Sequence, residues 1–401
     1  MQITRLEGLL AALALALLAG CAAPCGAPGR LCAPAEPNTS MLAKLPVQPP
    51  ASAFARPSAA QQEAPAPPAP VAGPLRIALL VPLQSQTLAL PATAVRDGFL
   101  AAWQHDRAGV EVDVVGTGDD VAQVLDAYRL AAASHDLVAG PLARPAVNAL
   151  AASGTLARPT IALNHPDPGV TLPPNMLVIG LSTEDEARQV ADWAAREHPA
   201  GRALVLAGDQ AWQQRMAQGF EQRWSELGRN SHLAELPATD GKVDRDAIDL
   251  VRTQMEIDPP ELIFAALDAG QLRQVRAVLG TAVACYAASP ANPGRDTGEP
   301  MAELNGVRLL DLPWEVEPAH QAVMVYPRWL ESGHTLDMDR LYALGIDAYR
   351  VALALARAPN APVELDGVTG KLAASLSGNP AFRRAEAAVV VRDGKFEAAG
   401  P

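Results

Sequence analysis

Few residues of this 401-residue chain have the types and spacing that catalysis or metal binding requires. Gly116-Thr117-Gly118 matches only part of the glycine pattern that holds a dinucleotide, and it follows the second expected strand, so we interpret it as a turn before a helix. The sequence contains no phosphate-binding loop, no nucleophile elbow and no zinc-binding helix motif. Its 7 histidines are scattered, without helical ligand spacing. We therefore expect no catalytic residue, no metal and no cofactor.

The acidic stretch Ser182–Glu186 is the other place where chemistry might be sought, because three carboxylates lie together there. Its spacing also fits a capping box, either from Ser182 to Asp185 or from Thr183 to Glu186. Carboxylates in the first turn of a helix complement the helix dipole. We therefore interpret the stretch as the start of a helix, placed where the chain passes from one lobe to the next.

Cys21 is the residue whose context predicts a covalent modification. Residues 9–18 are an uninterrupted run of Leu and Ala, followed by Leu18-Ala19-Gly20-Cys21. This run is about half of the ~20 residues that span a bilayer, which favours a signal peptide over a membrane helix. The four residues resemble a bacterial lipobox, so we expect residues 1–20 to be removed and Cys21 to carry the lipid. The alternative is an ordinary signal peptide with an incidental cysteine.

Residues 21–74 are expected to be a lipidated cysteine followed by a disordered linker. Residues 22–74 contain 13 prolines and five charges, so they bury too little surface to offset the entropy of ordering. Such a tether reaches at most about 160 Å in the polyproline II conformation. Cys25 and Cys32 lie within it, where an oxidising compartment would permit a disulfide, whereas the apolar surroundings of Cys285 predict a buried thiol.

From residue 75 onward, short apolar runs alternate with amphipathic stretches, which predicts an α/β fold with parallel sheets. Two series of such units predict two doubly wound lobes with a cleft between the carboxyl ends of their strands. We assign about 75–181 plus about 310–356 to the first lobe. We assign about 182–305 plus the C-terminal segment to the second. Helices are expected at 318–330 and 338–356, and a hairpin at 389–397.

Strand ends that face the predicted cleft are the candidate binding positions. They are Gly140, Pro141, Leu142, Asn164, Ser182 and Ser289. An unidentified small ligand would bind among them. In the helix predicted at 338–356, Tyr342, Ile346 and Tyr349 share one face and are expected in the core, and Gly345 suggests close packing against a neighbouring element. Asp347 is expected to be solvated or to cap a helix.

Two resemblances follow from sequence strings. The start I-A-L-L-V-P-L-Q-S, with the D-G-F-L-A-A helix after it, resembles the type I periplasmic-binding-protein fold. Eight further strings in order resemble the LppC/LpoA family of outer-membrane lipoproteins that activate class A penicillin-binding proteins. They are G-P-L (140–142), A-L-N (162–164), L-S-T-E-D-E-A (181–187), Y-A-A-S (286–289), L-N-G-V-R (304–308), L-P-W (312–314), R-L-Y-A-L-G-I-D-A-Y (340–349) and L-D-G-V-T-G-K-L (365–372).

The LppC/LpoA resemblance implies a non-enzymatic regulator of peptidoglycan synthesis, held in the outer membrane by its lipid and facing the periplasm. Ala22, which follows the cysteine where Asp would retain a lipoprotein in the inner membrane, agrees with Gram-negative sorting to the outer membrane. Longer family members carry a helical-repeat domain before the binding-protein-like domain, whereas this sequence has the Pro-rich segment there.

The alternative function is a periplasmic receptor for an amino-acid-like ligand. In amino-acid receptors of this fold, the loop after the third strand offers hydroxyls and backbone N–H groups to a carboxylate. Here that loop is Ala143-Arg144-Pro145-Ala146, which has no hydroxyl and one residue without an N–H. The charge excludes another class: residues 1–74 sum to +1 within a total of −12, which leaves −13 on residues 75–401 and disfavours nucleic acid as a partner.

Overall fold

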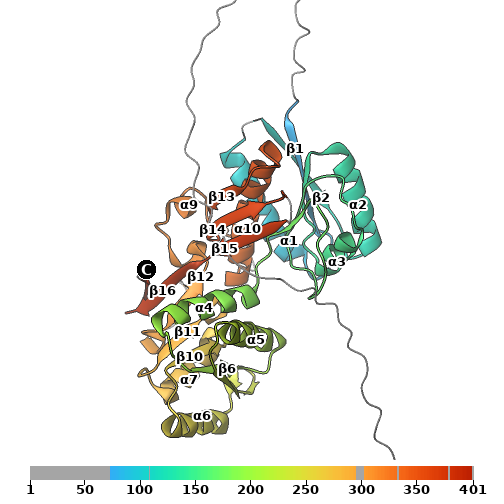
Figure 1. Ribbon diagram of the computed structural model, residues 1–401. Helices are drawn as coiled ribbons and strands as arrows, with labels where there is room; N and C mark the ends of the chain where they lie inside the picture. The colour runs from blue at the N-terminus through green and yellow to red at the C-terminus, as the bar shows by residue number, and fades with distance from the viewer. Residues whose placement is uncertain (1–72, 108, 295–301, 332–333, 378–379, 400–401) are drawn as a thin grey trace, which may run out of the picture. The chain divides into compact units, whose positions relative to one another are not determined.

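The computed structural model describes residues 73–399 except 108, 295–301, 332–333 and 378–379. The predicted signal peptide, Cys21, the proposed linker and the pair Cys25 and Cys32 therefore lie outside the described residues. The remaining chain folds into two α/β lobes, each built on a largely parallel sheet (Figure 1). The predicted fold class is confirmed for this part.

The first lobe contains a five-stranded sheet in the order β2-β1-β3-β4-β5, with all strands parallel. Side chains of β1 alternate between two cores: Ile77 and Leu79 pack with α1 and α10, while Ala78 and Leu80 pack with α2 and α3. The strands are β1 (Leu75–Val81), β2 (Val110–Gly116), β3 (Leu137–Ala139), β4 (Thr160–Ala162) and β5 (Met176–Val178). The helices are α1 (Ala89–His105), α2 (Val121–Ser134), α3 (Arg144–Ala152) and α10 (Leu336–Arg357).

Helices α1 and α10 pack closely because each has a glycine at the contact. A Cβ added at Gly345 of α10 would lie 2.1 Å from the carbonyl oxygen of Val95, and one at Gly98 of α1 would lie 1.9 Å from that of Tyr342. The close packing predicted for Gly345 is confirmed. Tyr342, Ile346 and Tyr349 are buried, as predicted.

The second lobe contains a seven-stranded sheet in the order β17-β16-β12-β11-β10-β6-β7. Helices α4 and α5 cover one face and α6 and α7 the other, and β16 is antiparallel to both of its neighbours, β12 and β17. Its strands are β6 (Ala203–Ala207), β7 (Ser231–Glu235), β10 (Leu262–Ala266), β11 (Ala284–Ala287), β12 (Arg308–Asp311), β16 (Ala387–Arg392) and β17 (Lys395–Ala398), with a small hairpin of β8 (Ala238–Thr239) and β9 (Lys242–Val243). Its helices are α4 (Thr183–Glu197), α5 (Ala211–Glu226), α6 (Arg245–Ile257) and α7 (Ala269–Leu279), with 3-10 turns at η1 (Ser289–Ala291) and η2 (Ala302–Leu304).

The chain passes between the lobes three times: between β5 and α4, after β12, and between β15 and β16. The segment after β12 contains the short helices α8 (Pro313–Val316) and α9 (Gln321–Met324). The helix predicted at 318–330 is therefore wrong over most of its length: α9 ends at Met324, and Pro327, which lacks an N–H, follows it.

The range 310–356 predicted for the returning segment needs correction at both ends. Leu310 and Asp311 pair with β16 in the second sheet, so the return begins after them. The core of the first lobe continues to Ala374, because it includes an antiparallel sheet that the sequence did not predict. This sheet consists of β13 (Val363–Asp366), β14 (Lys371–Ser375) and β15 (Ala381–Ala385).

Candidate functional site

Four of the six predicted cleft residues lie together at the carboxyl ends of β3 and β4. Gly140 has φ +123° and donates its N–H to the Ile161 carbonyl at 2.7 Å. Asn164 Nδ2 donates to the Leu142 carbonyl at 3.1 Å, and the Pro141 carbonyl accepts from the backbone N–H of Leu163. These polar groups are thus already bonded to one another, and Leu142 is buried.

The other two predicted residues have different surroundings. Ser182 caps α4, because its Oγ accepts from the backbone N–H of Asp185 at 3.1 Å. Ser289, 4% exposed, donates its backbone N–H to Glu186 Oε2 at 3.1 Å. The sequence predicts a capping role for Glu186, but its side chain is buried and accepts this hydrogen bond from the first residue of η1, which follows β11.

An ion pair that the sequence did not reveal joins the two lobes. Arg340 of α10 lies 2.9 Å (Nη2) and 3.2 Å (Nε) from the two carboxylate oxygens of Asp311, at the end of β12. Arg340 also donates to the Ser289 carbonyl at 2.8 Å, and Asn292 Nδ2 donates to Asp311 Oδ2 at 2.8 Å. Both members of the pair are buried, with side-chain exposures of 8% and 0%. Burial alone would lower the pKa of Arg340, but the Asp311 carboxylate raises it above its ordinary value.

Three glutamates around this ion pair are held in low-dielectric surroundings. Burial raises the pKa of Glu186 to about 7, against the hydrogen bond from Ser289, and raises that of Glu315 in α8 to about 8. Burial and then the neighbouring Glu186 raise the pKa of Glu386, between β15 and β16, well above its usual range. Glu315 Oε1 and Glu386 Oε2 have no hydrogen-bond partner among the described residues. At neutral pH, Glu315 and Glu386 therefore favour the protonated form, whereas Glu186 populates both forms.

A second set of contacts fixes the small sheet to the crossings. Arg384 of β15 donates to the carbonyls of Ile179 and Gly180, at 2.8 and 3.0 Å, and to Thr369 Oγ1 at 3.1 Å. Asp347 accepts from the backbone N–H and the hydroxyl of Thr369, both at 2.7 Å. Asp347 is 1% exposed, so the predicted solvated or capping role is wrong. It anchors the turn between β13 and β14.

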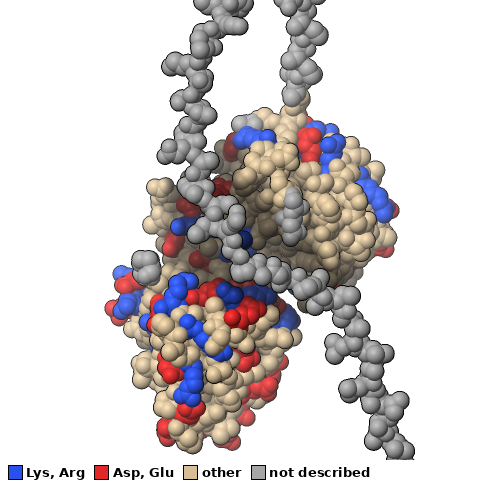
Figure 2. Space-filling model, viewed as in Figure 1, with Lys and Arg blue, Asp and Glu red and all other residues tan. Residues whose placement is uncertain are grey.

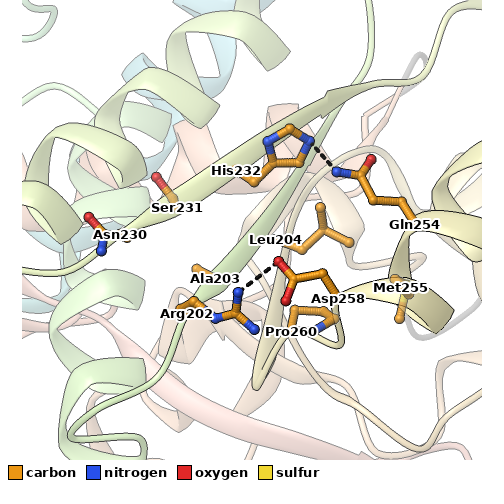
Figure 3. A pocket seen from close by; sticks show the side chains of 10 residues that line it. All are labelled: Arg202, Ala203, Leu204, Asn230, Ser231, His232, Gln254, Met255, Asp258 and Pro260. Carbon is orange, nitrogen blue, oxygen red and sulfur yellow. Dashed lines mark hydrogen bonds and ion pairs between the residues drawn. The ribbon is translucent and has the colours of Figure 1, made fainter.

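Two pockets among the described residues are relevant to ligand binding. One, of about 640 Å³, has walls from both lobes, including Trp193 and Arg196 of α4 and Lys371 of β14, and Glu386 lines it. The other, of about 260 Å³, lies at the amino ends of β6 and β7 (Figure 3). Its charged and polar groups pair with one another: Arg202 with Asp258 at 2.7 Å, and His232 with Gln254 at 2.9 Å. Neither pocket is lined by a predicted cleft residue.

The described residues contain no cluster of three or more His, Cys, Asp or Glu side chains that would hold a metal ion. Within the same part of the chain, no helix has both the length and the apolar character needed to cross a bilayer. Cys285 is 2% exposed, which confirms the predicted buried thiol, and burial raises its pKa. On the face shown in Figure 2, acidic and basic side chains are interspersed over the second lobe.

Comparison with known proteins matches the model of the family "LppC putative lipoprotein" to residues 71–380. The chain belongs to the LppC family. A relative named penicillin-binding protein activator LpoA, from Vibrio cholerae serotype O1, is 25% identical over 342 residues, which cover 75% of this chain and 54% of the relative. The chain thus spans about half the length of the curated relatives it matches.

Solved structures agree with the fold. The C-domain of LpoA from Haemophilus influenzae, described as a regulator of PBP1A, has a TM-score of 0.64 at 22% identity, and the match covers 81% of this chain and all of that domain. A protein from Chromobacterium violaceum, described as a "putative branched-chain amino acid ABC transporter", has a TM-score of 0.66 at 33% identity over 79% of this chain and all of its own length. The periplasmic-binding-protein-like fold is confirmed.

Proposed function

We propose that this LppC-family chain is a non-enzymatic lipoprotein that binds a class A penicillin-binding protein and stimulates peptidoglycan synthesis. The observation that supports this most is the family match over residues 71–380, together with relatives named as penicillin-binding protein activators. The described residues add a compatible feature, because the groups at the predicted cleft rim bond to one another and to the fold.

The proposed activation requires differential binding, since an activator shifts its partner only if it prefers the active conformation. We further propose that Cys21 is lipidated and anchors the protein to the outer membrane, with residues 22–74 as the spacer to the synthase. Photo-crosslinking in cells, with a crosslinker at exposed positions of each lobe, tests the partnership. Recovery of a class A synthase supports it, and recovery of no such synthase from any position contradicts it.

A receptor for a small amino-acid-like ligand is the second candidate. The resemblance to the Chromobacterium violaceum protein favours it, because that match is 33% identical over the full length of the relative. The sequence of the loop at 143–146 opposes it, since its residues lack hydroxyls and Pro145 lacks an N–H. A ligand that binds only the native state raises the melting temperature. A screen of branched-chain and other amino acids by thermal shift therefore separates the two functions, and a concentration-dependent rise would favour the receptor.

A further inference from the structure

The three crossings between the lobes converge on one set of charged groups, in which Glu186 and Asp311 are buried and Glu386 is half-buried. Glu186 lies in the first turn of α4, just after the first crossing. Asp311 ends β12, just before the chain returns to the first lobe. Glu386 lies between β15 and β16, at the third crossing. Arg340 reaches this set from α10 and bonds both Asp311 and the Ser289 carbonyl, whose residue in turn donates its N–H to Glu186. A change at Glu186, Arg340 or Asp311 is therefore transmitted to more than one crossing.

The first and third crossings are also tied directly to each other. Arg384, two residues before Glu386, donates to the carbonyls of Ile179 and Gly180 just before α4. The backbone N–H of Glu386 donates to Gln189 Oε1 of α4 at 3.1 Å. Glu186 and Glu386 thus belong to the two segments that these bonds hold together.

This set of charged groups contains more carboxyl groups than cations. Glu186, Asp311, Glu315 and Glu386 face the guanidinium groups of Arg340 and Arg384. Other charged groups of both signs lie near this set. Asp337 and Asp339 of α10 add negative charge, Asp339 pairs with His334, and Asp185 and Asp347 act on Arg384. Arg328 acts on Glu315 as a cation, and Arg196 and Lys371 line the same pocket as Glu386. Arg328 stacks on Trp314 at 4.1 Å and donates to its carbonyl.

We propose that these carboxyl groups form a proton-dependent latch between the lobes. While Glu186 and Glu386 retain protons, α4 and the β15–β16 segment pack together as described above. When both ionise, two carboxylates lie near Asp311 and the guanidinium groups of Arg340 and Arg384, and their repulsion acts across the bonds made by Arg384 and Gln189. The lobes then gain freedom to change their separation by hinge motion. Burial raises the pKa of Glu186 to about 7 and holds the pKa of Glu386 well above its usual range, so the transition lies at or above neutral pH.

Spin-label distance measurements on the chain from residue 21 test the latch. Cys21, Cys25 and Cys32 are replaced by Ser, while Cys285 stays unlabelled because it is 2% exposed. Labels are placed at Leu130→Cys in α2 and Leu250→Cys in α6, whose side chains are 74% and 69% exposed. We expect a narrow inter-lobe distance distribution at pH 5.5, and a broader or displaced one at pH 8.5. The variant E186Q/E386Q should keep the narrow distribution at both pH values.

A control and three contradictory outcomes complete the experiment. Glu364→Gln changes an exposed glutamate of β13 away from the crossings and should respond to pH as the wild type does. The proposal is overturned if the wild-type distribution is the same at both pH values, or if E186Q/E386Q changes as much as the wild type. It is also overturned if circular dichroism shows that the change at pH 8.5 is global unfolding. The measurement needs no synthase, so it is independent of the proposed function.

Discussion

Replacing Glu315 by Gln should remove a large part of the pH dependence of stability. The side chain is 4% exposed, its Oε1 has no partner among the described residues, and its pKa is raised from 4.5 to about 8 mainly by burial. Because the native state holds this proton more tightly than the unfolded state, the contribution of Glu315 is fully present below pH 4.5. It is lost as the pH rises to about 8.

The magnitude follows from the size of the shift. Each unit of difference in pKa corresponds to about 1.4 kcal/mol, so between pH 5 and pH 8 the wild type should lose about 3 kcal/mol through Glu315 alone. Gln has nearly the same shape and no proton to lose. We therefore expect the two proteins to have similar unfolding free energies at pH 5, and Glu315→Gln to be more stable by about 3 kcal/mol at pH 8.

Urea unfolding followed by tryptophan fluorescence at pH 5, 6, 7 and 8 measures this difference. Only the gap between wild type and variant matters, because Glu186 and Glu386 titrate in both proteins. The exposed Glu364→Gln variant is the control and should follow the wild type at every pH. A gap between wild type and Glu315→Gln that stays constant from pH 5 to pH 8 would refute the assigned burial of a protonated carboxyl group.

Three further variants test the packing, the ion pair and the anchor. Gly345→Ala should lower the free energy of unfolding by about 1–3 kcal/mol, because the added Cβ would meet the backbone of α1. Gly118→Ala is the control and should leave the free energy of unfolding unchanged, because a Cβ there would have no atom within 4 Å. Equal urea midpoints for the two variants would contradict this prediction. Asp311→Asn should lower the free energy of unfolding in urea by about 3–5 kcal/mol, because it leaves the buried Arg340 without its carboxylate partner. A decrease below about 1 kcal/mol would show that this ion pair does not stabilise the fold. Cys21→Ser should abolish incorporation of a palmitate analogue and move the protein out of the membrane fraction; unchanged labelling would rule out lipidation at this residue.

The sequence predicted most of the sheet strands because those strands are buried and therefore appear as short apolar runs. β10 (Leu262–Ala266) is an example, because all five of its residues are apolar and buried. The contact at Gly345 was also predictable, since glycine inside a long helix is costly unless a neighbour requires the space. By contrast, β15 (Ala381–Ala385) is half exposed and contains two arginines, so it lacks an apolar signal.

The charged groups at the crossings could not be predicted because their partners are distant in sequence. Arg340 and Asp311 are 29 residues apart and belong to different lobes. Glu186 lies in the first turn of α4, where a carboxylate is explained by the helix dipole, and only the folded structure shows that it faces inward. The available signal was an aspartate at the end of β12, flanked by Leu310 and Leu312.

The proposed activation is tested most directly by the rate of glycan-chain polymerisation from lipid II, measured for each class A synthase of the same organism with and without the chain from residue 21. A coupling of about 1–3 kcal/mol predicts a saturable increase of roughly 5- to 150-fold for the cognate synthase. No change in rate for any of these synthases, together with no detectable binding at the same protein concentrations, would contradict the proposal.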